Sequence, residues 1–184
     1  MYLNDLISLV RNVIEDNSST DTDVHTYENS DIFTITESNV ISVSEVRQNS
    51  SALDSGDWSY DSSNNKITIS ASCSAGDSIE IDYSYYPDYS DTEIVGQLKS
   101  AIMYLSIFGY KTFEEIDGYI YPDPTSEEKN LIAAIAGILI KPDNIEYSLP
   151  DFRVKVPQSL PTRDIIKQTI AMFKTKGHGI FFVT

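Results

Sequence analysis

Cysteine and histidine are scarce in this chain of 184 residues, which has one Cys and two His. A single thiol, Cys73, cannot form an intrachain disulfide, so the sequence permits a reducing compartment without requiring one. A glycine-rich phosphate loop is missing as well. The usual nucleophilic, zinc and nucleotide chemistries therefore lack their ingredients, and we expect no enzymatic activity, no cofactor and no bound metal.

Long apolar runs are also missing. The longest one, Leu131–Ile140, spans ten residues, about half of what a membrane-spanning helix needs. The N-terminal segment carries Asp5 and has no basic residues ahead of an apolar stretch, unlike a secretory signal. We therefore expect no association with a membrane.

Basic side chains are outnumbered, because 13 Lys and Arg stand against 28 Asp and Glu, a formal net charge of −15. This charge repels phosphate backbones and anionic lipid, which argues against a general nucleic-acid binder. Hydrophobic residues make up 41% of the chain and aromatic residues 11%, enough to bury a core. The sequence predicts one folded domain, or one domain with a small inserted module.

Helical periodicity occurs in four segments. The first, residues 3–14, has apolar side chains at the i, i+3, i+4, i+7 spacing of an amphipathic helix. The polar residues 15–23 that follow predict a loop. Three further helices are expected at residues 90–108, 127–141 and 162–173.

The helix expected at residues 127–141 differs from the others in having apolar or small residues at every position from Leu131 to Ile140. An apolar surface on all sides is too wide for a surface helix, so this one should be central and buried. Its small residues would let neighbouring backbones approach closely. They are Ala133, Ala134, Ala136 and Gly137.

Period-two alternation replaces the helical pattern between residues 31 and 86. Segments such as Ile67–Ser70 and Ile79–Tyr85 place apolar side chains on one face and polar ones on the other. Turn residues separate these segments, for example at Asp61–Asn65. We expect an antiparallel β module of four or five strands here. A later alternating segment, Phe152–Val156, could pair as a short strand or run extended.

Together these segments predict an α+β fold. A small bundle of about four helices would comprise residues 1–16 and 88–176. The β module, residues 31–86, would be inserted between the first and second helices, and an extended tail would follow at residues 177–184. Because the first helix cannot bury its apolar face alone, it must pack on the later helices.

Charge is unevenly distributed along the chain. Residues 14–93 carry 17 acidic and two basic side chains, whereas residues 141–184 carry four acidic and seven basic ones. Such polarity could place the acidic part of one copy near the basic part of the next, or orient the chain between two different partners. Chance clustering on a soluble surface is the alternative.

The C-terminal residues form an apolar, strand-like tail behind two glycines. Such a segment either adds a strand to its own sheet or is donated to a partner. Donation would make the tail and the preceding bases a partner-binding site. The residues concerned are Arg153, Lys155, Lys174, Lys176, Ile180, Phe181, Phe182 and Val183.

Two pairs of aspartates have oxygen spacings that a calcium ion could use. They are Asp21 with Asp23 and Asp88 with Asp91. Neither pair has the glycine turn and bidentate glutamate of a dedicated calcium loop, so ordinary loop acids are favoured.

Tyrosines are abundant around residues 83–89, and Trp58 and Tyr60 belong to the same module. Aromatic rings of this kind could form a face on which sugars stack. More often such rings close the core of a small sheet or an interface, and hydrogen-bond at its rim. Both roles stay open at this point.

The order of parts along the chain carries a resemblance to a known family. Its elements are the amphipathic N-terminal helix, the helix opened by Tyr89–Ile94, the loop Gly118–Thr125, the buried helix ending Ile138–Pro142, and a short helix before an extended tail. The β stretch around Asp57–Asp61 looks like the hairpin modules common in virion proteins. In this order of parts the chain resembles the head-to-tail connector proteins of tailed bacteriophages, also called adaptor, head-completion or neck proteins.

The resemblance implies a structural virion protein of the neck region, assembled in the host cytoplasm. It would form a ring of about a dozen identical copies under the portal protein and continue the DNA channel toward a downstream neck or tail protein. DNA would pass without specific binding, which suits negatively charged walls. The basic C-terminal third and the tail would then be the anchoring end. The alternative function is a carbohydrate-binding or adhesion module that uses the Tyr- and Trp-rich β face.

Overall fold

The computed structural model describes residues 1–143, 146–149, 152–155, 160–176 and 179–182. The chain divides into two compact units. Unit 1 comprises residues 1–16 and 91–184, and unit 2 comprises residues 17–90. Helices and antiparallel sheets occur together, which confirms the predicted α+β class.

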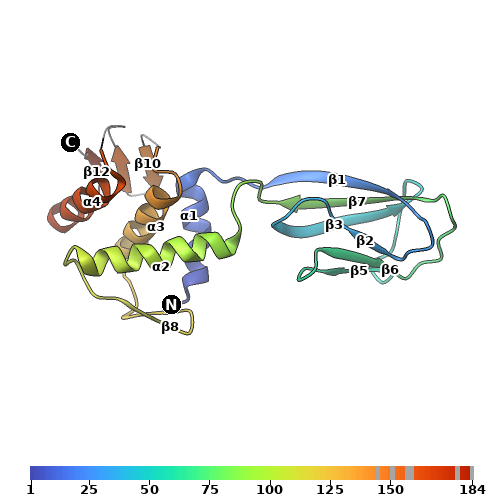
Figure 1. Cartoon of the computed structure of the whole chain (residues 1–184), viewed down its shortest axis with the longest axis horizontal. Coiled ribbons are helices and arrows are strands. Elements are labelled where there is room, and N and C mark those ends of the chain that lie inside the picture. Colours follow the sequence, from blue (N-terminus) through green and yellow to red (C-terminus); the bar gives the residue numbers. More distant parts are fainter. Residues whose placement is uncertain (144–145, 150–151, 156–159, 177–178, 183–184) are drawn as a thin grey trace. The chain divides into compact units, whose positions relative to one another are not determined.

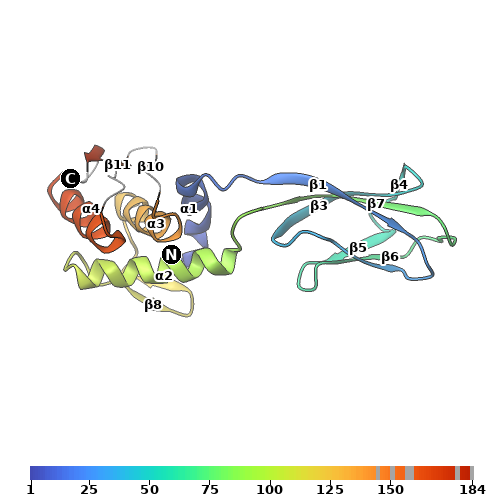
Figure 2. The same ribbon diagram turned by 45° about the horizontal axis from the view of Figure 1, so that its top comes forward.

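Unit 1 contains one 3₁₀-helix and four α-helices within the described residues (Figure 1, Figure 2). They are η1 (Leu3–Leu6), α1 (Ile7–Ile14), α2 (Asp91–Ile107), α3 (Ser126–Ile140) and α4 (Thr162–Lys176). All four predicted helical segments are therefore helical. Helices α1, α2 and α4 each contact α3, and α3 is buried from residue 131 to residue 138. The prediction of a central helix is confirmed.

Helix α3 begins with a reciprocal exchange between the side chains and backbone N–H groups of Thr125 and Glu128. The hydroxyl of Thr125 accepts from the backbone N–H of Glu128 at 3.2 Å, and the carboxylate of Glu128 accepts from the N–H of Thr125 at 2.8 Å. Lys111 donates to both oxygens of Glu128, at 2.9 and 3.0 Å. The two bonds between Thr125 and Glu128 satisfy free backbone donors at the start of the central helix, and the Lys111 bonds hold the Glu128 carboxylate in place.

Small residues on α3 bring its backbone close to α1. A Cβ atom built on Gly137 would overlap Cγ1 of Val13 and would lie 3.3 Å from the Cβ of Val13. Only a glycine fits at this point of the helix pair. This confirms the expected close approach at Gly137.

Five strands in two small sheets complete unit 1 as far as the structure describes it. They are β8 (Glu114–Ile116), β9 (Tyr119–Tyr121), β10 (Glu146–Leu149), β11 (Phe152–Lys155) and β12 (Gly179–Phe182). Strands β8 and β9 form an antiparallel hairpin, and the other sheet has the order β10-β11-β12. The alternating segment after residue 151 is thus a strand, whereas the hairpin and β10 were not predicted.

Unit 2 consists of two sheets whose strands are all antiparallel to their described neighbours. The first sheet has the order β1-β7-β3-β4 and the second the order β2-β6-β5. The strands are β1 (Ser19–Thr26), β2 (Ile32–Thr34), β3 (Val40–Gln48), β4 (Ser51–Ala52), β5 (Trp58–Asp61), β6 (Lys66–Ile69) and β7 (Ser78–Tyr85).

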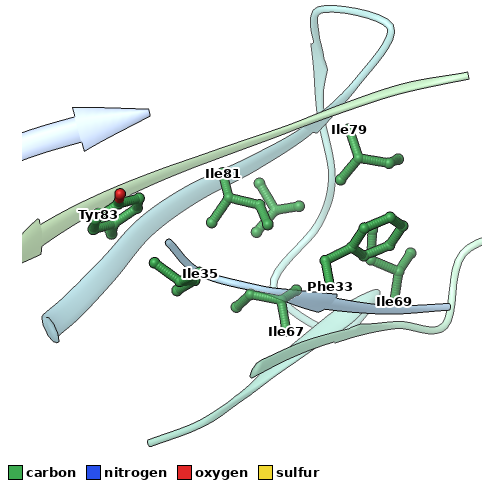
Figure 3. Packing of buried hydrophobic residues seen from close by; sticks show 8 residues of the cluster. Phe33, Ile35, Ile67, Ile69, Ile79, Ile81 and Tyr83 are labelled. Carbon is green, nitrogen blue, oxygen red and sulfur yellow. The ribbon is translucent and has the colours of Figure 1, made fainter. Parts of the chain in front are cut away.

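One hydrophobic cluster joins the two sheets of unit 2, and Figure 3 shows its side chains pointing toward one another. The alternating residues of β6 and β7 supply most of it, as their period-two pattern predicted. The buried members are Phe33, Ile35, Val46, Ile67, Ile69, Ile79, Ile81 and Tyr83.

The prediction of a loop over residues 15–23 is wrong from Ser19 onward, because β1 begins there and pairs with β7 along its whole length. Its side chains are polar apart from Val24, which is exposed, so they show no apolar alternation. Asp23 accepts hydrogen bonds from the hydroxyl of Tyr83 at 3.2 Å and from the N–H of Thr36 at 2.6 Å. Backbone pairing and these bonds hold β1 in place of apolar burial. The module therefore starts earlier than residue 31.

Candidate interaction surfaces

Two of the expected anchoring bases are paired within their own sheet. Arg153 and Lys155 of β11 both contact Glu146 of β10, with nitrogen–oxygen distances of 3.0 and 3.3 Å. Glu146 and Lys155 are also direct cross-strand partners. Cross-strand pairs of opposite charge stabilise a sheet, so these two bases have a role inside unit 1.

A third expected anchor, Lys174 of α4, contacts the C-terminal end of α2. Its ammonium group donates to the carbonyl oxygens of Phe108 at 3.3 Å and Gly109 at 2.8 Å. These carbonyls follow the last turn of α2, where a cation offsets the negative end of the helix dipole. Lys174 therefore joins α4 to α2. The side chain of Lys176 lies outside the described residues.

The tail is a strand of its own chain. Strand β12 pairs in parallel with β11, and Ile180, Phe181 and Phe182 stand opposite Arg153, Val154 and Lys155, respectively. Of the two alternatives that the sequence left open, the single chain shows internal docking. Donation to a partner stays a prediction that would require β12 to leave β11. The side chains of Ile180–Phe182, and the whole of Val183, lie outside the described residues.

The aromatic rings of unit 2 pack mainly inward. Tyr83 is buried, and burial is the main reason that its pKa lies well above the ordinary tyrosine value. Trp58, Tyr60 and Tyr85 are partly buried against the same cluster. These four rings therefore serve the core, which is the structural role that the sequence offered beside sugar stacking.

A polar hollow of about 480 Å³ lies on the outer side of the β1-β7-β3 sheet. Arg47 sits in it and pairs with Glu45 at 2.6 Å, Glu80 at 2.9 Å and Asp82 at 2.5 Å. Asp82 also accepts from the hydroxyl of Thr22 at 2.6 Å. Desolvation opposes ionisation of Asp82, but the bonds from Thr22 and Arg47 outweigh it and lower its pKa. Because these groups already satisfy one another, the hollow is poorly suited to an anionic ligand.

Two of the aspartates considered for calcium, one from each pair, have other roles. Asp23 is in β1 and binds Tyr83 and Thr36, and Asp91 binds Arg11 of α1 at 2.6 Å. In the part of the chain that the structure describes, no group of three or more His, Cys, Asp and Glu is placed to hold a metal ion. Among the same residues, no helix is long and apolar enough to cross a membrane.

Acid should weaken unit 2 through Asp77. Its carboxylate accepts from Asn49, from the backbone N–H of Ser74 and from Gln48, at 2.8, 2.8 and 2.6 Å, and these bonds lower its pKa. A pKa lowered by folding gives stability above the unfolded-state pKa, near 4, which is lost as pH falls through the folded value. We therefore expect the urea midpoint of unit 2 to fall as the pH drops below about 5.

The fluorescence of Trp58 follows this transition, because it is the only tryptophan and lies in unit 2. An Asp77→Asn variant should be less stable near pH 7 and should show a flatter decline in acid. Glu28→Gln, which removes an exposed loop carboxylate, serves as the control. An Asp77→Asn profile parallel to the wild type would contradict the role of Asp77.

Unit 1 exposes a cluster of large rings beside the hairpin. We call it the hairpin patch and define it as Tyr2, Ile116, Tyr119 and Tyr121. Tyr2, Ile116 and Tyr121 are each about half exposed. The ring centroids of Tyr2 and Tyr119 are 3.7 Å apart, and those of Tyr119 and Tyr121 are 6.0 Å apart. Tyrosine is enriched at protein interfaces because its large, rigid ring combines apolar area with a polar tip.

Hydrogen bonds from the N-terminal residues and an ion pair with α2 hold the hairpin patch in place. The backbone of Leu3 donates to Gly118 at 2.8 Å, and that of Ile120 donates to Met1 at 2.9 Å, so the first residues flank β9 like a third strand. Lys99 of α2 contacts Glu115 at 3.0 Å. The Lys99 contact, and then a bond from the N–H of Gly118, lower the pKa of Glu115. A preformed surface loses little conformational entropy on binding.

Helix α2 exposes a second apolar surface, the α2 stripe, formed by Met103 and Ile107. These side chains are 55% and 56% exposed, and one helical turn places them on the same face. The opposite face of α2 is buried with Ile94, Leu98, Ala101, Ile102 and Leu105. Exposed apolar side chains at this spacing are typical of a helix that contacts a partner.

Sequence reasoning placed the interaction site at the C-terminus and missed both apolar surfaces. The methionine and isoleucine of α2 were visible as apolar residues outside its main stripe, but helical periodicity alone does not distinguish a partner-facing side chain from a core one. Comparison with known proteins adds no assignment, because no family model and no curated protein matches the chain.

Proposed function

We propose that this chain is a structural assembly protein that works by binding copies of itself and neighbouring proteins, as a head-to-tail connector of a tailed phage does. The observation that carries the proposal is the exposure of the hairpin patch and the α2 stripe on unit 1. Half-exposed rings and aliphatic side chains are costly in water and are suited to burial against protein. A connector in a ring contacts a neighbour on each side and so requires more than one such surface.

The charge of unit 2 supports the connector form of the proposal. Unit 2 carries 13 acidic and two basic side chains, a formal balance of −11. A ring multiplies this charge by its number of subunits, which repels the phosphates of passing DNA. DNA would therefore move through the neck without being held. The proposed partners are the portal protein, neighbouring copies in the ring and a downstream neck or tail protein.

The proposal predicts that the purified full-length chain forms rings, alone or with the portal protein from the same genome. Negative-stain microscopy and mass photometry measure this directly. Replacing the α2 stripe, as Met103→Ser with Ile107→Ser, should weaken assembly roughly tenfold or more, because each lost apolar contact removes burial at every interface.

The matched control replaces two similarly exposed residues of unit 2, as Val24→Ser with Ile41→Ser, at 67% and 46% exposure. This variant should assemble like the wild type. A chain that stays monomeric at high concentration and ignores the portal would overturn the proposal. Specific binding on a glycan array would instead favour the carbohydrate-binding alternative.

A further inference from the structure

Acidic side chains surround the hairpin patch. Glu114 and Asp117 lie on the hairpin and Asp5 on η1, and all three are exposed. Two positive groups at this hairpin are already paired: Lys99 with Glu115, and the N-terminal ammonium of Met1 with Asp123. The hairpin patch is therefore an aromatic surface with a negative rim, and its best partner carries a positive charge beside an apolar hollow.

Helix α4 offers basic side chains beside a hollow of mixed polar and apolar lining on the same chain, with one exposed acid, Asp164, among them. Its inner face is buried through Ile165, Ile166, Thr169, Ile170 and Phe173. Its outer side exposes Arg163 and Lys167 and contains a hollow of about 230 Å³. The hollow is lined by Leu160, Asp164, Lys167, Gln168 and Ala171. We call this outer side the α4 face.

The two surfaces lie on different sides of unit 1. In both views the hairpin lies on one side of α2, and α4 lies on the other, next to the C-terminal end of the same helix (Figure 1, Figure 2). They are therefore separate patches of one copy. When two different patches of identical chains bind each other, the contact is head-to-tail, and repeating it closes a ring if the rotation allows.

We propose that the hairpin patch of one copy docks on the α4 face of the next. The rings of Tyr119 and Tyr121, with Ile116, would cover the hollow, while Glu114 and Asp117 would face Arg163 and Lys167. The opposite charges of rim and helix select a second copy as the occupant. This inference rests on the proposed function, since it assigns the subunit contact of the proposed assembly.

Two charge variants test this contact. The rim variant combines Glu114→Lys with Asp117→Asn, and asparagine suits position 117 because its φ is +51°. The helix variant combines Lys167→Glu with Arg163→Gln. Each variant alone would place like charges across the contact, so the concentration at half-assembly should rise roughly tenfold or more.

An equimolar mixture of the two variants should assemble again. The positively charged rim of the rim variant then meets the negatively charged α4 face of the helix variant. At the next contact the native rim of the helix variant meets the native α4 face of the rim variant, so the two variants alternate around the ring. A control variant, Glu28→Lys with Asp54→Asn, makes the same change of net charge as the rim variant on exposed positions of unit 2 and should assemble normally. Circular dichroism checks that each variant is folded.

Three outcomes would overturn the contact: normal assembly of both variants, failure of the mixture, or loss of assembly in the control. Failure of the mixture would point to another partner, such as the portal, on the hairpin patch. Failure of the proposed function gives a different result, since the wild type itself would then form no oligomer at any concentration or with the portal.

Discussion

Replacing Arg11 with methionine should lower the free energy of unfolding of unit 1 by about 3–5 kcal/mol. Arg11 of α1 is only 4% exposed, and its guanidinium binds both Asp16 and Asp91. The side chain of Asp16 is fully buried. Methionine keeps most of the volume of the arginine but leaves a carboxylate in the interior without its cation, which is the costly way to break a buried ion pair.

Two spectroscopic signals separate this effect from any change in unit 2. The four described α-helices belong to unit 1, so far-UV circular dichroism follows its unfolding, whereas Trp58 follows that of unit 2. In urea, Arg11→Met should shift the helical transition and leave the fluorescence transition nearly unchanged. Adding Asp16→Leu removes both charges and should recover a large part of the loss. A shift of the helical transition below about 1 kcal/mol would refute the role of Arg11.

Gly137→Ala should destabilise unit 1 by about 1–3 kcal/mol, although alanine is the better helix former. Helix propensity alone would favour alanine by about 0.8–1.0 kcal/mol in a helix interior. The new methyl group would, however, overlap Val13 on α1. Overpacking in a core forces the two helices apart, so the loss of contacts between them outweighs the gain in propensity.

Gly96→Ala on α2 is the matched control, because a Cβ atom there has no neighbour within 4 Å. This variant should be stabilised by roughly 0.5–1 kcal/mol. A double variant with Val13→Ala and Gly137→Ala should be more stable than the sum of the single effects predicts, since the smaller residue makes room for the methyl. Thermal and urea unfolding of Gly137→Ala, Gly96→Ala, Val13→Ala and the double variant measure whether each change raises or lowers the free energy of unfolding. Stabilisation by Gly137→Ala would show that the helices separate at little cost.

The parts of the fold that the sequence predicts are those with a distinctive apolar pattern. Helix α3 has apolar residues on all sides, and strands β6 and β7 alternate strictly, so the central helix and the core of unit 2 follow from the pattern. Strand β1 has polar residues on both faces, and its place depends on backbone pairing with β7 and on the bonds of Asp23. The sequence pattern does not reveal bonds between residues so far apart.

The candidate site was harder to predict for a similar reason. A sequence shows that the C-terminal third is basic but not which bases are already paired. Glu146 holds Arg153 and Lys155, and the carbonyls of Phe108 and Gly109 hold Lys174. Whether an apolar side chain is exposed depends on tertiary packing, so the hairpin patch and the α2 stripe can be identified only from the structure.

Arg11 also joins the two points at which the chain crosses between its units. Asp16 is the last residue of unit 1 before the chain enters unit 2, and Asp91 is the first after its return. Within unit 2, Ser19 and Tyr85 are direct partners, so its two ends are neighbours as well. A segment with adjacent ends can be inserted into a host chain without changing the path of the chain through the host's core. Residues 17–90 therefore form one continuous insertion between two neighbouring points of the helical host.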